Sequence, residues 1–429
     1  MPFGLLRHFR KDAPGFLLET RERYGDVAFL RLSGQDVYLL NHPDYIRDVL
    51  VTNQTNFTKS RVLERSKRML GEGLLTSEGQ FHLRQRRMIQ PAFHRERLRG
   101  YATAMTSWAI RTRDRWQAGQ TIDMSEEMAR LTLGIVGQTL FSANVEEDAP
   151  EVGRALAEIL ESFNMVMLPY FELLEKLPLP FLQRFREARE TLDRIVYRII
   201  AERRASGDDK GDLLSMLLLA RDEDDDGSMT DEQVRDEAMT LFLAGHETTA
   251  VALTWAWYLL SQHPEVAARM RAEIGNEPPG FDDLPRLKYV EMVFAETLRL
   301  YPPAWAIGRK AIAGHRINGE YETKAGSILL QSPYVMHRDP RYFAEPDRFD
   351  PDRWLPENVA ERPKFSYLPF GGGTRVCIGE RFAWMEGVLL LATIAQRWSP
   401  KLSPGHPVRH KALLTLRPAF GMKMILEPA

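Results

Sequence analysis

The chain has a single cysteine, Cys377, and the residues around it are suited to hold a metal-binding thiolate. The segment Phe365 to Gly379 reads FSYLPFGGGTRVCIG, in which three consecutive glycines allow a tight backbone free of side chains. Apolar residues recur with helical spacing after Cys377, so we expect the thiol to lie near the start of a helix. The N–H groups and the dipole of a helix start favour the thiolate, which is the form that binds a metal ion. Arg375 adds positive charge beside the site.

Simpler roles for Cys377 compete with a metal site. A free cysteine commonly packs in a core like a small hydrophobic side chain. A structural zinc site needs four clustered ligands, and no such set lies near Cys377 in the sequence. A lone cysteine excludes an intrachain disulfide and fits a reducing compartment.

A second segment with chemical potential lies inside a long helical pattern that runs from Asp231 to about Gln262. Thr230 is suited to cap its start, and the helix would be roughly 48 Å long at 1.5 Å per residue. A helix of this length without polar relief at its middle must cross the interior of the protein. Its central face is made mostly of small side chains, which leave room for a planar cofactor. The residues on this face are Leu241, Ala244, Gly245, Thr248 and Ala252.

Glu247 and Thr248 are polar residues at the centre of this expected buried helix. Buried polar groups need partners, so their presence calls for an explanation. Thr248 can donate a hydrogen bond back to the carbonyl of Ala244 and bend the helix. The residues alone therefore allow either a kinked helix with a satisfied acid or a pair that handles protons.

The two segments together resemble the cytochrome P450 family. The pattern Phe370-x-x-Gly373-x-Arg375-x-Cys377-x-Gly379 is similar to the haem-binding signature of that family. Ala244 to Thr248 is similar to its A-G-x-[Asp/Glu]-Thr motif. The resemblance implies that Cys377 is the axial ligand of a haem b iron and that Arg375 pairs with a haem propionate. It also implies that Glu247 and Thr248 deliver protons while dioxygen is cleaved.

Further motifs of the family follow in order along the chain. Glu296 and Arg299, three residues apart in a helical pattern, could form an ordinary surface ion pair. They match the family's E-x-x-R motif, whose partner would be Arg353 in Pro351-Asp352-Arg353-Trp354. The resemblance implies that these three charges support the cysteine loop in a structural role.

Three more residues are expected to bind the haem propionates. His82 and Arg86 lie four apart on one expected helix face, which alone would suggest a solvated basic stripe. The family commonly has Trp-x-x-x-Arg here, and an imidazole N–H can also donate to a carboxylate. Arg309 falls where the family places another propionate-binding arginine. The segment His337 to Pro340 followed by Phe343 resembles a family landmark with a role in the fold.

The expected fold is mainly α with small β-sheets, as a single cytochrome P450 domain over residues 1–429 with the long helix above the haem. An early strand pair is expected at DVAFLRL and VYLL around a turn at residues 33–36. The absence of a βαβ repeat disfavours a doubly wound sheet. A net charge of −2 argues against nucleic-acid binding. No apolar run is long enough to span a membrane, so we expect a cytoplasmic protein, assumed to be a monomer.

The residues expected to contact substrate are small or apolar, which suits a hydrophobic ligand. By their family positions, Met69 and Leu70 would lie in a loop over the haem, and the segment from Phe163 to Phe181 would form the roof. A long apolar substrate such as a fatty acid, terpenoid or carotenoid is expected. The other expected pocket residues are Leu241, Ala244, Ala304 and Ala306.

The resemblance implies a monooxygenase that uses O2. No flavin or ferredoxin module follows Cys377, so we expect electrons from a separate ferredoxin or flavodoxin-type donor with its reductase. Two alternatives remain open: a peroxygenase of the same fold that uses hydrogen peroxide, and a non-catalytic haem-binding sensor. Basic residues near the cysteine would attract an acidic donor. They are Arg84, Arg87, Arg375 and Arg381.

Overall fold

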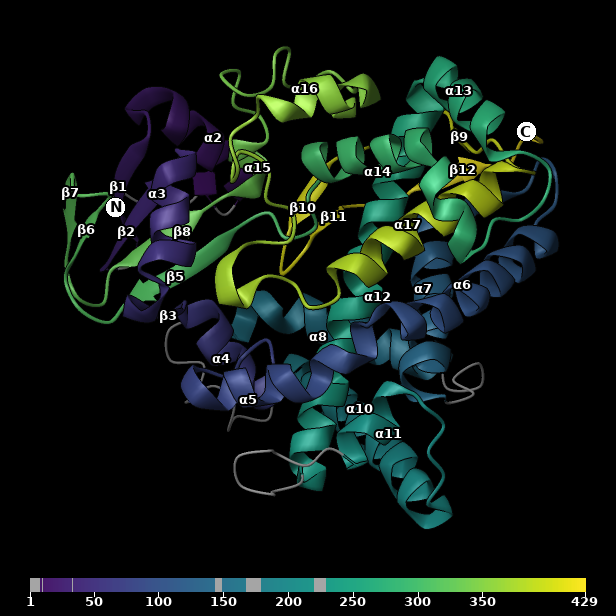
Figure 1. Ribbon diagram of the computed structural model, residues 1–429, viewed down its shortest axis with the longest axis horizontal. Coiled ribbons are helices and arrows are strands. Elements are labelled where there is room, and N and C mark those ends of the chain that lie inside the picture. The colour runs from purple at the N-terminus through teal and green to yellow at the C-terminus, as the bar shows by residue number, and fades with distance from the viewer. Residues whose placement is uncertain (1–7, 10, 33, 143–148, 167–178, 220–228) are drawn as a thin grey trace.

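The computed structural model describes residues 8–9, 11–32, 34–142, 149–166, 179–219 and 229–429. Helices dominate it, and the largest sheet lies beside the N-terminal helices, whereas other strands lie near the C-terminus (Figure 1). The longer helices are α2 (Ala13–Tyr24), α4 (Arg61–Leu70), α5 (Gly79–Ile89), α6 (Arg95–Arg115), α7 (Met124–Phe141), α8 (Ala149–Val166), α10 (Pro180–Ser206), α12 (Asp231–Gln262), α13 (Pro264–Ile274), α14 (Lys288–Leu300) and α17 (Glu380–Ala395). The shorter ones are α3 (Pro43–Arg47), α11 (Leu213–Leu219), α15 (Pro333–Met336) and α16 (Pro356–Ala360).

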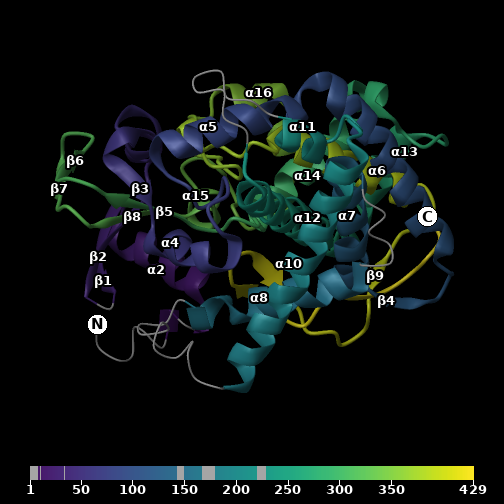
Figure 2. The same ribbon diagram turned by 90° about the horizontal axis from the view of Figure 1, so that it is seen from below.

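Helix α12 crosses the core, as its sequence predicts. Thr230 caps it through a reciprocal pair of hydrogen bonds with Gln233, so two N–H groups at the helix start are satisfied. The helix is 32 residues long and is buried along most of that length. It packs against α7, α10, α14 and α17, and Figure 2 shows it near the centre of the molecule. The helix that carries the small-residue face is therefore held from several sides.

The largest sheet has five strands in the order β1-β2-β8-β5-β3. β1 and β2 form the expected antiparallel pair, with Val27 opposite Leu40 and Leu32 opposite Gln35. The turn is shorter than expected, because Gln35 and Asp36 are already in β2 and pair with β1. β8 joins β2 in parallel. The strands of this sheet are β1 (Val27–Leu32), β2 (Gln35–Leu40), β3 (Phe57–Lys59), β5 (Ile307–Ala311) and β8 (Ile328–Gln331).

Three smaller sheets complete the described architecture. One of them, the hairpin of β10 and β11, contacts α12, because the indole N–H of Trp255 donates to the carbonyl of Leu416 at 2.8 Å. None of the described helices has the length and apolar character needed to cross a membrane. The strands are β4 (Thr121–Asp123), β9 (Lys401–Leu402) and β12 (Lys423–Ile425); β6 (His315–Ile317) and β7 (Tyr321–Thr323); and β10 (His410–Ala412) and β11 (Leu416–Pro418).

Candidate functional site

The cysteine loop has the tight backbone that its glycines predict. The N–H of Cys377 donates to the carbonyl of Phe370 at 3.0 Å, which closes the loop. Gly373 has a φ of 70°, and a Cβ atom there would lie 1.8 Å from the carbonyl oxygen of Leu50. A larger residue at this position would therefore clash with backbone that cannot easily move. Gly379 precedes the first residue of α17, so Cys377 lies just before a helix start, as expected.

The Cys377 side chain is accessible to solvent, although many protein atoms surround it closely. This enclosure raises the pKa of the thiol to about 11, and the N–H of Gly379 opposes the rise only in part. The N–H group at the helix start favours the thiolate, as expected, but desolvation of the thiol outweighs it. A metal ion deprotonates a coordinating thiol outright, so the position remains suited to a cation held at the sulfur.

Helix α12 presents its small residues on an accessible face. Ala244, Gly245 and Thr248 are exposed or partly exposed, whereas the other residues between Val234 and Trp257 are buried. The hydroxyl of Thr248 donates to the carbonyl of Ala244 at 2.7 Å, as predicted from the sequence. Leu241 and Ala252, assigned to the same face, are buried. The accessible part of the face is therefore short and nearly free of bulky side chains, which suits contact with a flat ring.

Glu247 and Thr248 do not share one side of α12, because adjacent helix positions point in different directions. The Glu247 carboxylate is buried and turns to the hairpin of β10 and β11. Its Oε1 accepts a hydrogen bond from Thr415 at 2.8 Å and lies 3.0 Å from Nε of Arg417. Burial raises the pKa of Glu247, and the nearby Arg417 guanidinium opposes that rise.

Basic side chains converge on the cysteine loop, and carboxylates near them are few. Burial, followed by repulsion from Arg375, lowers the pKa of Lys59 to about 6 and that of His82 to about 3. The same two causes lower the pKa of Arg309 to about 10. Glu78 is the acid that pairs with Arg375. The arginines of this cluster stay charged at neutral pH and would bind a partner with two carboxylates favourably.

The basic residues already have protein partners, and these partners tie them to the loops nearby. Arg86 donates to the carbonyl of Val376 at 2.8 Å, next to the cysteine. Arg375 donates to the carbonyl of Ser77 at 2.8 Å. His82 is buried and neutral, and a neutral imidazole retains one N–H donor. The expected propionate-binding residues are thus brought together by the fold.

These features fit a haem b. A thiolate is a known axial ligand of haem iron, the Ala244 to Thr248 face is flat, and the basic cluster matches the two propionates. Phe370 lies beside Trp384, with ring centroids 5.9 Å apart, and adds an aromatic surface near the loop. The fit rests on three separate parts of the chain, of which helix α5 and the segment before it bond directly to the cysteine loop.

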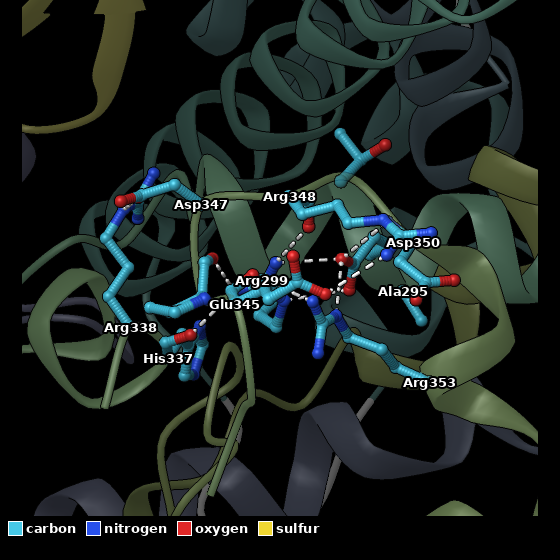
Figure 3. A network of polar contacts seen from close by, with 12 residues as sticks. Ala295, Arg299, His337, Arg338, Glu345, Asp347, Arg348, Asp350 and Arg353 are labelled. Carbon is cyan, nitrogen blue, oxygen red and sulfur yellow. Dashed lines mark hydrogen bonds and ion pairs between the residues drawn. The ribbon is translucent and has the colours of Figure 1, made fainter. Parts of the chain in front are cut away.

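The E-x-x-R motif forms a buried network and is not a surface pair. Both charged groups of Glu296 and Arg299 are fully buried, with Arg299 Nη2 2.8 Å from Glu296 Oε1 and Nε 2.8 Å from Oε2. Arg353 Nε lies 3.3 Å from Glu296 Oε1. The indole N–H of Trp354 and the backbone N–H of Asp350 also donate to this carboxylate, each at 3.0 Å. Figure 3 shows Arg299 and Arg353 approaching the centre of the network from different elements.

The same network reaches the cysteine loop through His337. Arg299 Nη1 donates to the carbonyl of His337 at 2.8 Å, as Figure 3 shows. The His337 ring accepts from the N–H of Leu368 at 2.9 Å, and Leu368 belongs to the loop that ends at Cys377. The hydroxyl of Tyr367 donates to the carbonyl of Ala295 at 3.0 Å. These contacts connect α14 with the segment that positions the thiol.

The expected substrate residues are only partly accessible. Ala304 and Ala306 are partly exposed, and Ala244 is exposed. Met69 and Leu70 end helix α4 and are buried, so their placement in a loop is corrected. The loop begins at Gly71, after a helix that the sequence reading did not include. Most of the expected roof between Phe163 and Phe181 lies outside the described residues, which omit positions 167–178.

Several residues of the site were not identified from the sequence. Lys59 and Glu78 belong to the basic cluster, and Thr415 and Arg417 contact Glu247. Lysines and glutamates are common on surfaces, so nothing local marks Lys59 as buried or Glu78 as the partner of Arg375. Arg417 lies far from Glu247 along the chain, and only the packing of the C-terminal hairpin on α12 brings them together.

Known proteins resemble this chain over most of its length. The family model described as cytochrome P450 matches residues 2–423. Cyclooctatin synthase of Streptomyces melanosporofaciens is 42% identical over 96% of this chain and 90% of its own length. Cyclooctat-9-en-7-ol 5-monooxygenase of the same organism is 38% identical over 90% of this chain and 85% of its own length. Pentalenene oxygenase of Streptomyces avermitilis is 36% identical over 94% of this chain and 90% of its own length.

The match covers nearly the whole chain, and the fold is the expected one, mainly α with small sheets. Members of this family bind haem b, act on small substrates, and need O2 and a redox partner. The chain therefore belongs to the cytochrome P450 family and is a haem-dependent monooxygenase.

Proposed function

We propose that this protein inserts one oxygen atom into a terpenoid, with Cys377 as the axial ligand of the haem iron. The observation that carries the proposal is the exposed Cys377 side chain just before the start of α17. In the middle of the central helix α12, only Ala244, Gly245 and Thr248 are accessible to solvent. Haem, when bound, supplies the site at which dioxygen is activated and transferred. A thiolate ligand donates electron density that favours cleavage of the O–O bond.

The basic cluster has the role of orienting the cofactor. Arg375 and Arg309 carry permanent charge for the two propionates, and His82 and Arg86 add donors from α5. Lys59 is held by the carbonyls of Leu74 and Ser77, both at 2.9 Å, and would regain its proton beside an anion. A cofactor fixed at its carboxylates cannot rotate against the face of α12.

Thr248 and Glu247 have the role of proton delivery. Release of one oxygen atom as water consumes two protons at a site closed to bulk solvent, so a relay is needed. Thr248 places a hydroxyl on the accessible face, and Glu247 is a buried acid on the next position. Burial raises the pKa of Glu247, which makes protonation of this acid easier. Arg417 is 29% exposed and links the acid to the protein surface.

A terpenoid is the substrate class that the relatives favour among the three apolar classes compatible with the sequence. Cyclooctatin synthase, cyclooctat-9-en-7-ol 5-monooxygenase and pentalenene oxygenase modify terpenoids. The accessible pocket candidates Ala244, Ala304 and Ala306 are small and apolar, which leaves room for a bulky hydrocarbon. The other expected pocket residues, Leu241, Met69 and Leu70, are apolar and buried.

The function is tested by supplying polycyclic terpene alcohols and hydrocarbons with NADPH, ferredoxin and its reductase under labelled O2. We expect oxygenated terpenoid that carries one labelled atom. In the variant Thr248→Ala, we expect product per NADPH oxidised to fall by roughly tenfold or more while NADPH consumption continues. Equal product formation with hydrogen peroxide alone would instead support a peroxygenase. Iron with a second protein ligand and no product would support a sensor.

A ferredoxin or flavodoxin-type donor is proposed to dock beside the cysteine loop. Arg87 and Arg381 are exposed and Arg84 is partly exposed, so these residues can face an acidic partner. Arg375 is half-buried and paired with Glu78, so it is better placed for the cofactor than for docking. The four residues were expected to act together, and we assign Arg375 to the cofactor and the other three to docking.

Reversing one docking charge is expected to slow electron transfer. In Arg87→Glu, the rate of reduction by ferredoxin at low salt should fall by roughly tenfold, and added salt should shrink the difference. Arg316→Glu, at an exposed position of strand β6, serves as the control of equal charge change. Equal rates for wild type and Arg87→Glu at low salt would exclude this docking surface.

We further infer that the chain acts as one domain and as a cytoplasmic monomer. Support comes from one family model that spans both sheets and helices. Sedimentation of the haem-loaded protein should give a particle of about 49.3 kDa. A particle of twice that mass at micromolar concentration would contradict the monomer.

A further inference from the structure

The loop of residues 71–77, which follows helix α4, is joined to α12 by two carboxylates. Asp236 Oδ2 accepts the N–H of Glu72 at 2.7 Å. Glu237 Oε2 accepts the N–H of Leu74 at 2.9 Å. Both acids are buried, and burial raises the pKa of Glu237 to about 8, so the extra strength of a hydrogen bond to a charged acceptor applies to Asp236, which also accepts from Arg235. The loop is thus held at two consecutive acids of one helix.

Two glycines allow this close approach. A Cβ atom on Gly71 would lie 2.0 Å from Oδ1 of Asp236. A Cβ atom on Gly73 would lie 2.5 Å from the Asp236 carbonyl oxygen and 2.3 Å from the Thr240 hydroxyl. Gly71 also has a φ of 70°, which disfavours other residues. The loop backbone therefore lies close against α12 and its acidic side chains, with no loop side chain in between at these two positions.

Arg235 links the same acid to helix α10. Its Nη1 donates to Asp236 Oδ1 at 2.8 Å, and its Nε donates to Asp193 Oδ1 on α10 at 2.7 Å. The Arg235 side chain is 4% exposed, so both pairs are shielded from solvent on the arginine side. One buried guanidinium therefore bridges carboxylates from two helices, and one of these carboxylates also holds the loop.

The position of these contacts relates them to the site. Asp236 precedes Ala244 by eight residues, which places it about 12 Å along the axis of α12. The loop follows Met69 and Leu70 directly and ends beside Lys59 and Arg375, which contact its carbonyls at Leu74 and Ser77. A movement of the loop would therefore displace both the apolar residues before it and the side chains of the basic cluster that bond to it.

We propose that Asp193, Arg235, Asp236 and the N–H of Glu72 form a latch that couples helix α10 to the loop 71–77. When the latch breaks, the loop and α10 both loosen from α12, and the apolar space near Ala244 becomes easier to enter. Arg235 and Asp236 are positioning residues, since they touch neither cofactor nor substrate. The part that concerns entry rests on the proposed function, whereas the coupling itself does not.

The coupling is tested by hydrogen–deuterium exchange on the full-length, haem-loaded protein. Arg235→Gln does not remove any bond to the loop, since Asp236 still accepts from Glu72. If the latch couples the two elements, this variant should raise exchange at the amides of Glu72 and Leu74 by roughly tenfold and should also raise exchange in α10 around Asp193. Asp236→Asn should raise exchange of the Glu72 amide at least as much.

Arg204→Gln is the matched control, because Arg204 also joins α10 to α12, through Asp231 at 2.7 Å, without contact to the loop. It should leave exchange of the Glu72 amide unchanged. Faster exchange in α10 alone for Arg235→Gln would overturn the coupling, and so would no change in either element. Faster loop exchange in Arg204→Gln would also overturn it, because general loosening would then explain the result.

Entry to the site is tested with two iron-binding probes of different size. Arg235→Gln should raise the association rate of 4-phenylimidazole several-fold and that of imidazole much less, since the small probe needs less opening. Equal changes for both probes would overturn the role in entry. The carbon monoxide spectrum of the same samples reports the thiolate ligand, so a failure of the proposed function is distinguishable from a failure of the latch.

Discussion

Replacing Glu296 by glutamine is expected to lower the free energy of unfolding by about 3–5 kcal/mol, because it leaves two buried guanidinium groups without their counter-charge. Arg299 and Arg353 both contact this carboxylate, and the Arg299 pair is fully buried. Glutamine keeps the volume and one acceptor oxygen, so loss of packing does not explain the effect. The indole of Trp354 and the N–H of Asp350 would compete for that remaining acceptor.

The measurement is chemical denaturation of the haem-free and haem-loaded protein, followed by circular dichroism. Glu345→Gln is the control, because Glu345 and Arg348 have the same three-residue spacing but are largely exposed. The control should change stability little, as exposed ion pairs contribute little. Equal stability of Glu296→Gln and wild type would contradict a structural role for the motif. A variant that does not fold at all would be consistent with that role, provided that Glu345→Gln folds normally.

The elements with strong local signals were predictable from the sequence. The capping residue Thr230 and the apolar pattern behind it placed α12 within its observed bounds. The β1–β2 pair and the helix after Cys377 were likewise marked by short-range patterns. Such features depend on neighbours within a few residues, which is the range over which helix caps and strand alternation act.

The features that escaped prediction depend on contacts between distant parts of the chain. Position 373 requires glycine because the carbonyl of Leu50 occupies the space that a Cβ atom would need. No residue near Gly373 in the sequence indicates this contact. Glu247 was assigned with Thr248, but its partners Thr415 and Arg417 come from the C-terminal hairpin. The pKa of Cys377 depends on how completely the fold desolvates the thiol.

Replacement of Cys377 has the largest expected effect on function, because this residue is the proposed ligand of the haem iron. Cys377→Ala is expected to abolish the spectrum of a thiolate-ligated haem, since no other cysteine exists in the chain. Alanine keeps the backbone N–H that donates to Phe370, and Gly373 keeps its place against Leu50, so the loop should retain its shape. Oxygenation of the terpenoid should be lost with the ligand, because the thiolate's electron donation favours O–O cleavage.

Thr248→Ala is the control for this prediction, because it removes a side chain from the facing helix without touching the ligand. It should keep the thiolate spectrum while its coupling of NADPH to product falls. Unchanged circular dichroism of Cys377→Ala would show that the loss of spectrum reflects ligation and not unfolding. A retained thiolate spectrum in Cys377→Ala would show that the ligand assignment is wrong.

The most direct test of the central claim is the carbon monoxide difference spectrum of the reduced wild-type protein beside Cys377→Ala. The account predicts the strongly red-shifted Soret band of a thiolate-ligated haem in wild type and no such band in the variant. A wild-type protein that binds no haem, or that shows the unshifted band of a nitrogen-ligated haem, would contradict the assignment of Cys377 and the mechanism built on it.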